Sequence, residues 1–333
     1  MNHFLSIGGN DPSYIQHLLR QSRYLHTNPS IKTLEGKNIL FCFEKPSLRT
    51  KVGTEVAINA LGGDVIHISP EAFLGGKVVH PSEFESDVPE EREALKDTVK
   101  NVSEWCDAIF ARVYRHQTLT TLASFSGIPI INALCDKHHP MQALADLYTL
   151  QEKFGEGHQL TVSFVGDANN VAFSLIEILL MSGHEIRFAG PREYYWDKQQ
   201  LHHFIQLAKR HRGTFTHSTD PLKAVSGADA VYTDAFVSMG EEKIYDEKLA
   251  AFRKYQVNGE LFEKAPSHAG FMHCLPAHRG VEVTDEVLDH ENSWIYDQAC
   301  NRMVVSKGVF STLLTDSQAA SPVASRRQLA AEA

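Results

Sequence analysis

The sequence predicts an α/β protein made of two doubly wound domains, each with a parallel sheet. Short apolar runs alternate with helical patterns through most of the chain, as strands and crossover helices do in parallel sheets. A length of 333 residues is enough for two domains of typical size, each with its own core. The expected strands are 38–43, 64–68, 108–113 and 128–132 in the first domain, and 160–165, 185–188 and 230–233 in the second.

The boundary between the two domains is expected near residue 150. A helical pattern at 147–154 separates the last strand of the first series from the first strand of the second. We therefore assign residues 1–147 to the first domain and residues 148–300 to the second. Residues 316–333 are rich in Ala, Ser, Arg and Gln without an apolar stripe, which predicts a tail that is disordered or only weakly helical.

Composition and charge exclude several classes of function. The formal net charge of −9 argues against a nucleic-acid surface, which normally shows as a basic stripe. The five cysteines are scattered, without a Cys-x-x-Cys pair, so neither a disulfide framework nor a zinc finger is expected. The start of the chain does not resemble an export signal, and the longest apolar run, 175–181, contains Glu177. These features predict a cytoplasmic protein that binds neither nucleic acid nor membrane.

One segment has the features of an anion site. Residues 45–51 stand between an expected strand and an expected helix, where the free N–H groups of a first helical turn and the helix dipole favour an anion. Ser47, Arg49 and Thr50 would add side-chain donors. The alternative is that Ser47 only caps the helix and Arg49 lies on a solvated face, so this segment alone does not establish a site.

A second polar pair follows the last strand of the first domain. His139 and Gln142 are three residues apart and can share a helix face, and both can donate a hydrogen bond to a carbonyl oxygen. Other patterns are weaker. The segment 166–170 lacks the Gly-x-Gly-x-x-Gly spacing of dinucleotide sites, and the histidine pairs 138–139 and 202–203 lack the spacing of zinc ligands. We therefore expect no nicotinamide cofactor and no structural metal.

Three segments together resemble the signature segments of the aspartate and ornithine carbamoyltransferase family. They are 43–50 (FEKPSLRT), 139–142 (HPMQ) and 273–276 (HCLP), and the resemblance extends from about residue 35 to about residue 314. It implies transfer of the carbamoyl group of carbamoyl phosphate to a side-chain amine, in a cleft between two domains, without a cofactor or metal. It also implies a homotrimer and a C-terminal helix, about 301–314, that packs back onto the first domain.

Two further segments resemble the family's binding sites for the acceptor amino acid. Residues 234–240 resemble its ornithine-binding loop, and residues 165–170 resemble the segment that supplies asparagine. An α-ammonium group pairs with a carboxylate, and an α-carboxylate pairs with amide or hydroxyl donors. The resemblance therefore implies L-ornithine as acceptor and citrulline and phosphate as products. The implied acceptor contacts are Asn169, Asn170, Asp234, Ser238 and Met239.

The resemblance also assigns the donor site. The implied contacts of carbamoyl phosphate are Ser47, Leu48, Arg49, Thr50, Arg112, His139, Gln142, Cys274, Leu275 and Arg302. Among them, the implied catalytic residues are Arg112, His139, Gln142, Cys274 and Arg302, which would orient the carbamoyl group and stabilise its developing oxyanion.

The attacking amine must also lose a proton. An alkylammonium group has a pKa of about 10.4, so the site should lower that pKa or supply an acceptor. Cys274, Asp234 and the departing phosphate are all candidates. Considered alone, Cys274 would be interpreted as a buried structural thiol; its place in the 273–276 segment favours a role in the site.

The chain departs from the family pattern at two places. Leu48 stands where the family usually has Thr, and apolar residues there also occur in N-acylornithine carbamoyltransferases. Residues 78–92 resemble an insertion, which either helps to select the amine or forms a solvated acidic surface. These departures leave two alternatives open: a carbamoyltransferase for N-acylornithine, putrescine or another diamine, and a non-catalytic relative that binds a small anion.

Overall fold

The computed structural model describes residues 3–74, 93–237 and 242–316. Within it the chain forms two compact units, and the chain passes from the first to the second between Met141 and Gln142. This point lies inside helix α6 (Pro140–Phe154), and the C-terminal helix α13 (Ile295–Asp316) enters the first unit at Arg302. The first unit comprises residues 1–9, 13–141 and 302–333, and the second comprises residues 10–12 and 142–301.

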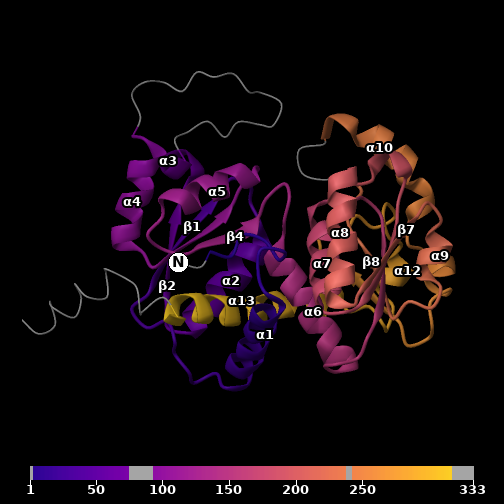
Figure 1. Cartoon of the computed structure of the whole chain (residues 1–333), viewed down its shortest axis with the longest axis horizontal. Coiled ribbons are helices and arrows are strands. Elements are labelled where there is room, and N and C mark those ends of the chain that lie inside the picture. Colours follow the sequence, from indigo (N-terminus) through magenta and orange to yellow (C-terminus); the bar gives the residue numbers. More distant parts are fainter. Residues whose placement is uncertain (1–2, 75–92, 238–241, 317–333) are drawn as a thin grey trace, which may run out of the picture. The chain divides into compact units, whose positions relative to one another are not determined.

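The first unit is built on a parallel sheet with the strand order β2-β1-β3-β4 (Figure 1). The inner strands β1 and β3 are apolar and buried almost throughout, because each has a neighbouring strand on both sides. The edge strand β2 is mostly exposed. The strands are β1 (Asn38–Phe43), β2 (Asp64–Ile68), β3 (Ala108–Arg112) and β4 (Ile130–Leu134).

In the first unit, the C-terminal helix α13 lies against α1 (Pro12–Thr27) and α2 (Leu48–Ala60) (Figure 1). Thr54 on α2 and Ser306 on α13 lie 3.2 Å apart between their hydroxyl oxygens. On the α1 side, a Cβ added to Gly308 would lie 2.6 Å from the backbone oxygen of Leu18, so α13 and α1 touch through backbone. The other helices are α3 (Pro70–Leu74), α4 (Leu95–Trp105) and α5 (His116–Phe125).

The second unit has a parallel sheet with the strand order β7-β6-β5-β8-β9. The strands are β5 (Thr161–Val165), β6 (Glu185–Ala189), β7 (Thr214–Ser218), β8 (Ala230–Thr233) and β9 (Gly270–His273). Its helices after α6 are α7 (Asn170–Met181), α8 (Lys198–His211), α9 (Pro221–Val225), α10 (Tyr245–Phe252), α11 (Gly259–Phe262) and α12 (Asp285–Leu288), with 3₁₀ turns at Arg192–Tyr194, Glu242–Ile244 and Arg253–Tyr255.

The predicted fold class is confirmed, because both described units have parallel sheets alternating with helices. Two strands, β7 and β9, were not among the expected ones. The predicted strand 128–132 begins two residues later, at Ile130, because Pro129 precedes it. Among the described helices, none combines the length and the apolar character needed to cross a membrane. The suspected insertion 78–92 and all of the predicted tail except Asp316 lie outside the described residues.

Candidate active site

The first turn of α2, which the sequence predicts to bind an anion, begins after Ser47. Ser47 occupies the N-cap position in an extended conformation, yet within the described chain its side chain makes no capping hydrogen bond. Its hydroxyl instead donates to Oγ1 of Thr50, at 3.0 Å. The first turn carries no acidic residue, so the positive end of the helix dipole is not neutralised there. The alternative in which Ser47 serves only as a cap does not match this geometry.

Arg302 joins this turn from α13. Its Nη2 donates to Oγ1 of Thr50, and both residues are buried. The hydroxyl of Ser306, one turn along α13, donates to the carbonyl oxygen of Arg302 at 2.8 Å and lies beside Thr54 of α2. The guanidinium group is therefore held against α2 by contacts both at its tip and along its own helix.

Arg112 and His139 complete the polar group of the first unit. Arg112 ends β3, and its carbonyl oxygen accepts the backbone N–H of Glu44 after β1, at 2.9 Å. His139 is buried just before α6. Its burial, and then the charges of Arg302 and Arg112, hold the pKa of His139 well below its usual range. The imidazole is therefore neutral near pH 7, with one nitrogen able to donate and the other able to accept.

Two other residues predicted to contact carbamoyl phosphate lie in the same turn of α2. Arg49 is half-buried there, and Leu48, its first residue, has a side chain that is 73% exposed. A solvent-facing Leu48 offers an anion only its backbone N–H, since its side chain has no polar atom.

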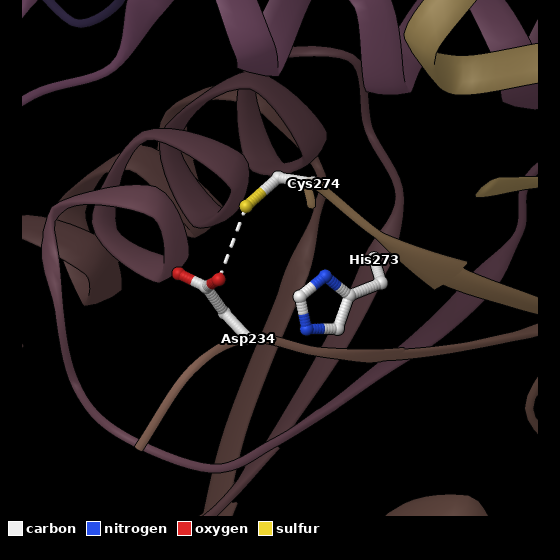
Figure 2. A group of neighbouring side chains, drawn as sticks. All are labelled: Asp234, His273 and Cys274. Carbon is white, nitrogen blue, oxygen red and sulfur yellow. Dashed lines mark hydrogen bonds between the residues drawn. The ribbon is translucent and has the colours of Figure 1, made fainter. Parts of the chain in front are cut away.

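In the second unit, one carboxylate and two hydrogen-bond donors meet where three neighbouring strands end. Asn169 follows β5, Asp234 follows β8 and Cys274 follows β9. Asn169 caps α7 by accepting the N–H groups of Val171 and Ala172 at 3.0 Å. Its Nδ2 donates to Oδ2 of Asp234 at 2.8 Å. The thiol of Cys274 donates to Oδ1 of Asp234 at 3.0 Å (Figure 2). Two donors from two loops thus orient one carboxylate.

The backbone after β9 is held by its own histidine. His273 is fully buried, and its Nδ1 accepts the backbone N–H of Leu275 at 2.9 Å. Leu275 has a φ of 55°, a conformation that L residues rarely adopt without support from their surroundings. The histidine therefore stabilises the turn that presents Cys274 and Leu275.

The ligand atoms of Asp234, His273 and Cys274 lie within 4.8 Å of one another, which is close enough to consider a metal ion. Nδ1 of His273 and the thiol of Cys274 already take part in the hydrogen bonds described above. Figure 2 shows the bond from Cys274 to Asp234. Those bonds account for the orientation of all three side chains, and we assign the group to hydrogen bonding.

Gln142 is held by a residue that sequence reasoning did not single out. Its Nε2 donates to Oδ1 of Asp146, one turn further along α6, at 2.8 Å. Asp146 is completely buried and also accepts hydrogen bonds from Gln298 and Tyr232. The spacing of four residues between Gln142 and Asp146 was the available signal, because such pairs face each other on a helix.

A second buried pair was also missed. Nζ of Lys248 on α10 lies 2.7 Å from Oδ2 of Asp167, in the loop after β5. Both side chains are almost fully buried, and Lys248 also lies over the rings of Tyr194 and Phe252. Because Asp167 stands two residues before Asn169, this ion pair fixes the loop that supplies Asn169 and Asn170.

The predicted site residues are thus divided into two groups by the unit to which each belongs. The first contains Ser47, Leu48, Arg49, Thr50, Arg112, His139 and Arg302. The second contains Gln142, Asn169, Asn170, Asp234, Cys274 and Leu275. The predicted acceptor contacts Ser238 and Met239 lie outside the described residues.

Comparison with known proteins gives matches over almost the whole chain. Residues 2–152 match the family model described as "Aspartate/ornithine carbamoyltransferase, carbamoyl-P binding domain", and residues 158–313 match the "Asp/Orn binding domain" of the same family. An ornithine carbamoyltransferase of Pyrobaculum calidifontis is 40% identical over 94% of this chain and 99% of its own length.

Solved structures give the same result. An ornithine carbamoyltransferase of Pyrococcus furiosus has a TM-score of 0.85 and 37% identity, covering 94% of this chain and 97% of its own. A mutant N-acetyl-L-ornithine transcarbamylase has a TM-score of 0.83 and 25% identity, covering 94% of this chain and all of its own.

Proposed function

Because this chain belongs to the aspartate/ornithine carbamoyltransferase family, we propose that it transfers the carbamoyl group of carbamoyl phosphate to the side-chain amine of L-ornithine. The products are citrulline and phosphate. The observation that carries the choice of acceptor is the carboxylate of Asp234, which Asn169 and Cys274 hold in place. An α-ammonium group is a fitting partner for such a carboxylate.

The polar group of the first unit supports a phosphoryl ligand. Three cationic side chains, Arg49, Arg112 and Arg302, belong to this group, together with the open first turn of α2. Guanidinium groups and helix N-termini both suit a phosphate. We assign the phosphate to Ser47, Arg49, Thr50 and the backbone N–H of Leu48.

The carbamoyl group is assigned to residues that can polarise its carbonyl. Arg112, Arg302 and neutral His139 supply donors for the oxygen, which gains negative charge when the amine adds. Gln142, Cys274 and Leu275 are the remaining carbamoyl contacts. Donors placed for a developing oxyanion each contribute about 3–4 kcal/mol to such reactions.

The acceptor is assigned to the second group of residues. Asp234 takes the α-ammonium group, and the amides of Asn169 and Asn170 face the amino-acid end of ornithine. Ser238 and Met239 remain part of the proposal from the sequence alone. In the reaction, the side-chain nitrogen forms a bond to the carbamoyl carbon, the bond from that carbon to the phosphate oxygen breaks, and the amine proton leaves with phosphate or passes to a nearby base.

A competition assay tests the proposal directly. Purified protein is incubated with carbamoyl phosphate and an equimolar mixture of ornithine, N-acetylornithine, N-succinylornithine, putrescine and aspartate, and the products are measured by mass spectrometry. Citrulline should dominate. Dominance of any other product would reject ornithine as the acceptor, and the absence of every carbamoylated product would reject the enzymatic assignment.

The second candidate acceptor is an N-acylornithine. The apolar, solvent-facing Leu48 in the first turn of α2 favours it, as does the structural likeness to an N-acetyl-L-ornithine transcarbamylase. In that case, Leu48→Thr should raise the preference for free ornithine over N-acetylornithine. An unchanged preference would remove Leu48 as the determinant of the acceptor.

We further propose that the protein forms a homotrimer through the face of α2 and β2. Leu48, Val52 and Val56 are spaced by four residues along α2 and are 73%, 49% and 47% exposed, and Ile66 on the edge strand β2 is 42% exposed. An exposed apolar stripe beside a sheet edge is typical of an interface. Native mass spectrometry should give three chains, and Val52→Glu should give monomers.

The proposed compartment is the cytoplasm. All five cysteines are free thiols in the structure, and Cys300 is exposed. Free thiols are typical of a reducing compartment.

A further inference from the structure

A buried carboxylate faces the histidine that supports the turn after β9. Glu282 is 0% exposed, and so is His273. Oε1 of Glu282 accepts the backbone N–H of His278 and lies 3.4 Å from Nε2 of His273. Its Oε2 lies 3.5 Å from Nδ1 of His278. A carboxylate without water needs polar partners of this kind, because removing its charge from solvent is costly.

The carboxyl group of Glu282 is ionised near neutral pH. Burial raises its pKa, but the ring of His273 and the backbone N–H of His278 lower it, and the resulting pKa lies below its ordinary value. An ionised carboxylate can only accept hydrogen bonds. The ring nitrogen that faces it is therefore expected to carry a proton.

The backbone determines the other nitrogen of the same ring. The N–H of Leu275 can only donate, and it donates to Nδ1 of His273 at 2.9 Å. Nδ1 is therefore the acceptor, and the proton of the ring is on Nε2, toward Glu282. Moving this proton to Nδ1 would set two donors against each other at Leu275 and two acceptors against each other at Glu282.

This ring supports a turn beside the proposed acceptor contacts. Leu275 has a φ of 55°, a conformation that is unfavourable for an L residue unless its surroundings hold it. The residue before it, Cys274, donates to Oδ1 of Asp234 at 3.0 Å. Relaxation of the turn would therefore move the thiol relative to this carboxylate.

We propose that Glu282 is a positioning residue that acts through His273. It keeps the ring proton on Nε2, so that Nδ1 holds Leu275 and the turn keeps the thiol of Cys274 on Asp234. This inference rests on the proposed function, in which Asp234 takes the α-ammonium group of the acceptor. Loss of this support should impair the use of ornithine, because small displacements of positioned groups are costly to the rate.

The test replaces Glu282 by methionine, which is of similar length but accepts only weak hydrogen bonds. Nε2 of His273 then faces a thioether in place of a carboxylate, and we expect kcat/KM for ornithine to fall about tenfold or more. The inhibition constant of inorganic phosphate should change by less than about threefold, because the phosphate is assigned to residues of the first unit. Glu282→Gln keeps an oxygen for the same N–H and should recover most of the activity.

Glu177→Met is the matched control. Glu177 is also a buried carboxylate of the second unit that faces a histidine, since its Oε1 lies 2.8 Å from Nε2 of His203, but neither residue belongs to the candidate site. A purely structural role for Glu282 predicts that both substitutions lower the melting temperature and that neither alters kcat/KM of the folded protein. That result would overturn the inference.

The position of the ring proton is measured by solid-state ¹⁵N NMR of protein labelled at histidine. His273→Asn identifies the signals of His273 among those of the 18 histidines. Wild-type protein should carry the proton on Nε2, and a proton on Nδ1 would overturn the inference whatever the activity.

If Glu282→Met does not fold, His273→Asn and His273→Leu replace it. An asparagine oxygen can accept the backbone N–H two residues further on, whereas leucine cannot. The Asn variant should therefore keep a kcat/KM for ornithine about tenfold or more above that of the Leu variant, and equal values would overturn the inference. Wild-type protein that forms no carbamoylated product rejects the proposed function, and active wild-type protein with an unaltered kcat/KM in Glu282→Met rejects only the role of Glu282.

Discussion

Replacing Asp234 by asparagine should remove the recognition of the acceptor's α-ammonium group while leaving the local structure in place. The carboxylate accepts hydrogen bonds from Nδ2 of Asn169 and the thiol of Cys274. An asparagine can keep its oxygen toward Asn169 and turn its NH2 toward the sulfur, which is a weak acceptor. The main change is then the loss of one negative charge.

The size of the effect follows from the bond that is lost. A hydrogen bond to a charged group contributes about 1.5–3 kcal/mol. At about 1.4 kcal/mol for each factor of ten, this corresponds to a loss of roughly 10- to 100-fold in kcat/KM for ornithine. Exposure does not weaken the bond much, because Asp234 is 8% exposed.

Two inhibitors separate this effect from general damage. 2-Aminopentanoate has the amino-acid end of ornithine without the side-chain amine, and pentanoate also lacks the α-amino group. Asp234→Asn should raise the inhibition constant of 2-aminopentanoate by the same factor and leave that of pentanoate unchanged. Asp285→Asn, at an exposed carboxylate paired with Arg279, is the control and should alter neither constant. Equal inhibition constants of 2-aminopentanoate for wild type and Asp234→Asn would refute the assignment of Asp234.

Three further predictions concern stability. Gly308→Ala should lower the free energy of unfolding by about 1–3 kcal/mol, because its Cβ would meet the backbone of α1. Gly53→Ala is the control: a Cβ there meets nothing within 4 Å, so the substitution should be neutral or stabilising, and denaturant titration of both variants checks this. Lys248→Met should lower the free energy of unfolding by about 3–5 kcal/mol, because it leaves Asp167 buried without its cation. The double variant Lys248→Met with Asp167→Asn should recover part of this stability, and equal losses in the single and double variants would refute the coupling. The pKa of His139 is lowered in the folded state, so His139 of the unfolded chain takes up a proton first as the pH falls. The free energy of unfolding should therefore drop below about pH 6.5, by up to about 1.4 kcal/mol per pH unit. Urea titrations at pH 5–7 should show a smaller drop for His139→Gln.

The fold could be predicted where strands are apolar and buried. β1, β3 and β8 are continuous apolar runs, so hydrophobic pattern alone indicates them. β7 is an edge strand with exposed polar residues, and its sequence TFTHS has no apolar run to detect. β9 has four residues and was not predicted as a strand, although the 273–276 motif begins at its last residue.

The candidate site likewise contains residues that the local sequence indicates and residues that only the fold brings together. Local sequence features pointed to Ser47 and His139, and the family resemblance of the 273–276 segment pointed to Cys274. The network around Asp146 could not be found in this way, since Gln298 lies 152 positions away and only the fold brings the two together. The direction of the Gln298 amide follows from the backbone N–H of His273, at the end of β9, which donates to its Oε1.

The position of Arg302 has a consequence for the order in which the protein becomes complete during synthesis. The first unit lacks α13 until nearly all of the described chain has been made, because residues 142–301 come between its two parts. Until then, the sides of α1 and α2 that contact Gly308 and Ser306 have no covering helix, and Thr50 has no arginine. A nascent chain that stops before α13 would therefore expose apolar surface, as incomplete domains do, and chaperones should retain it longer than the full-length product.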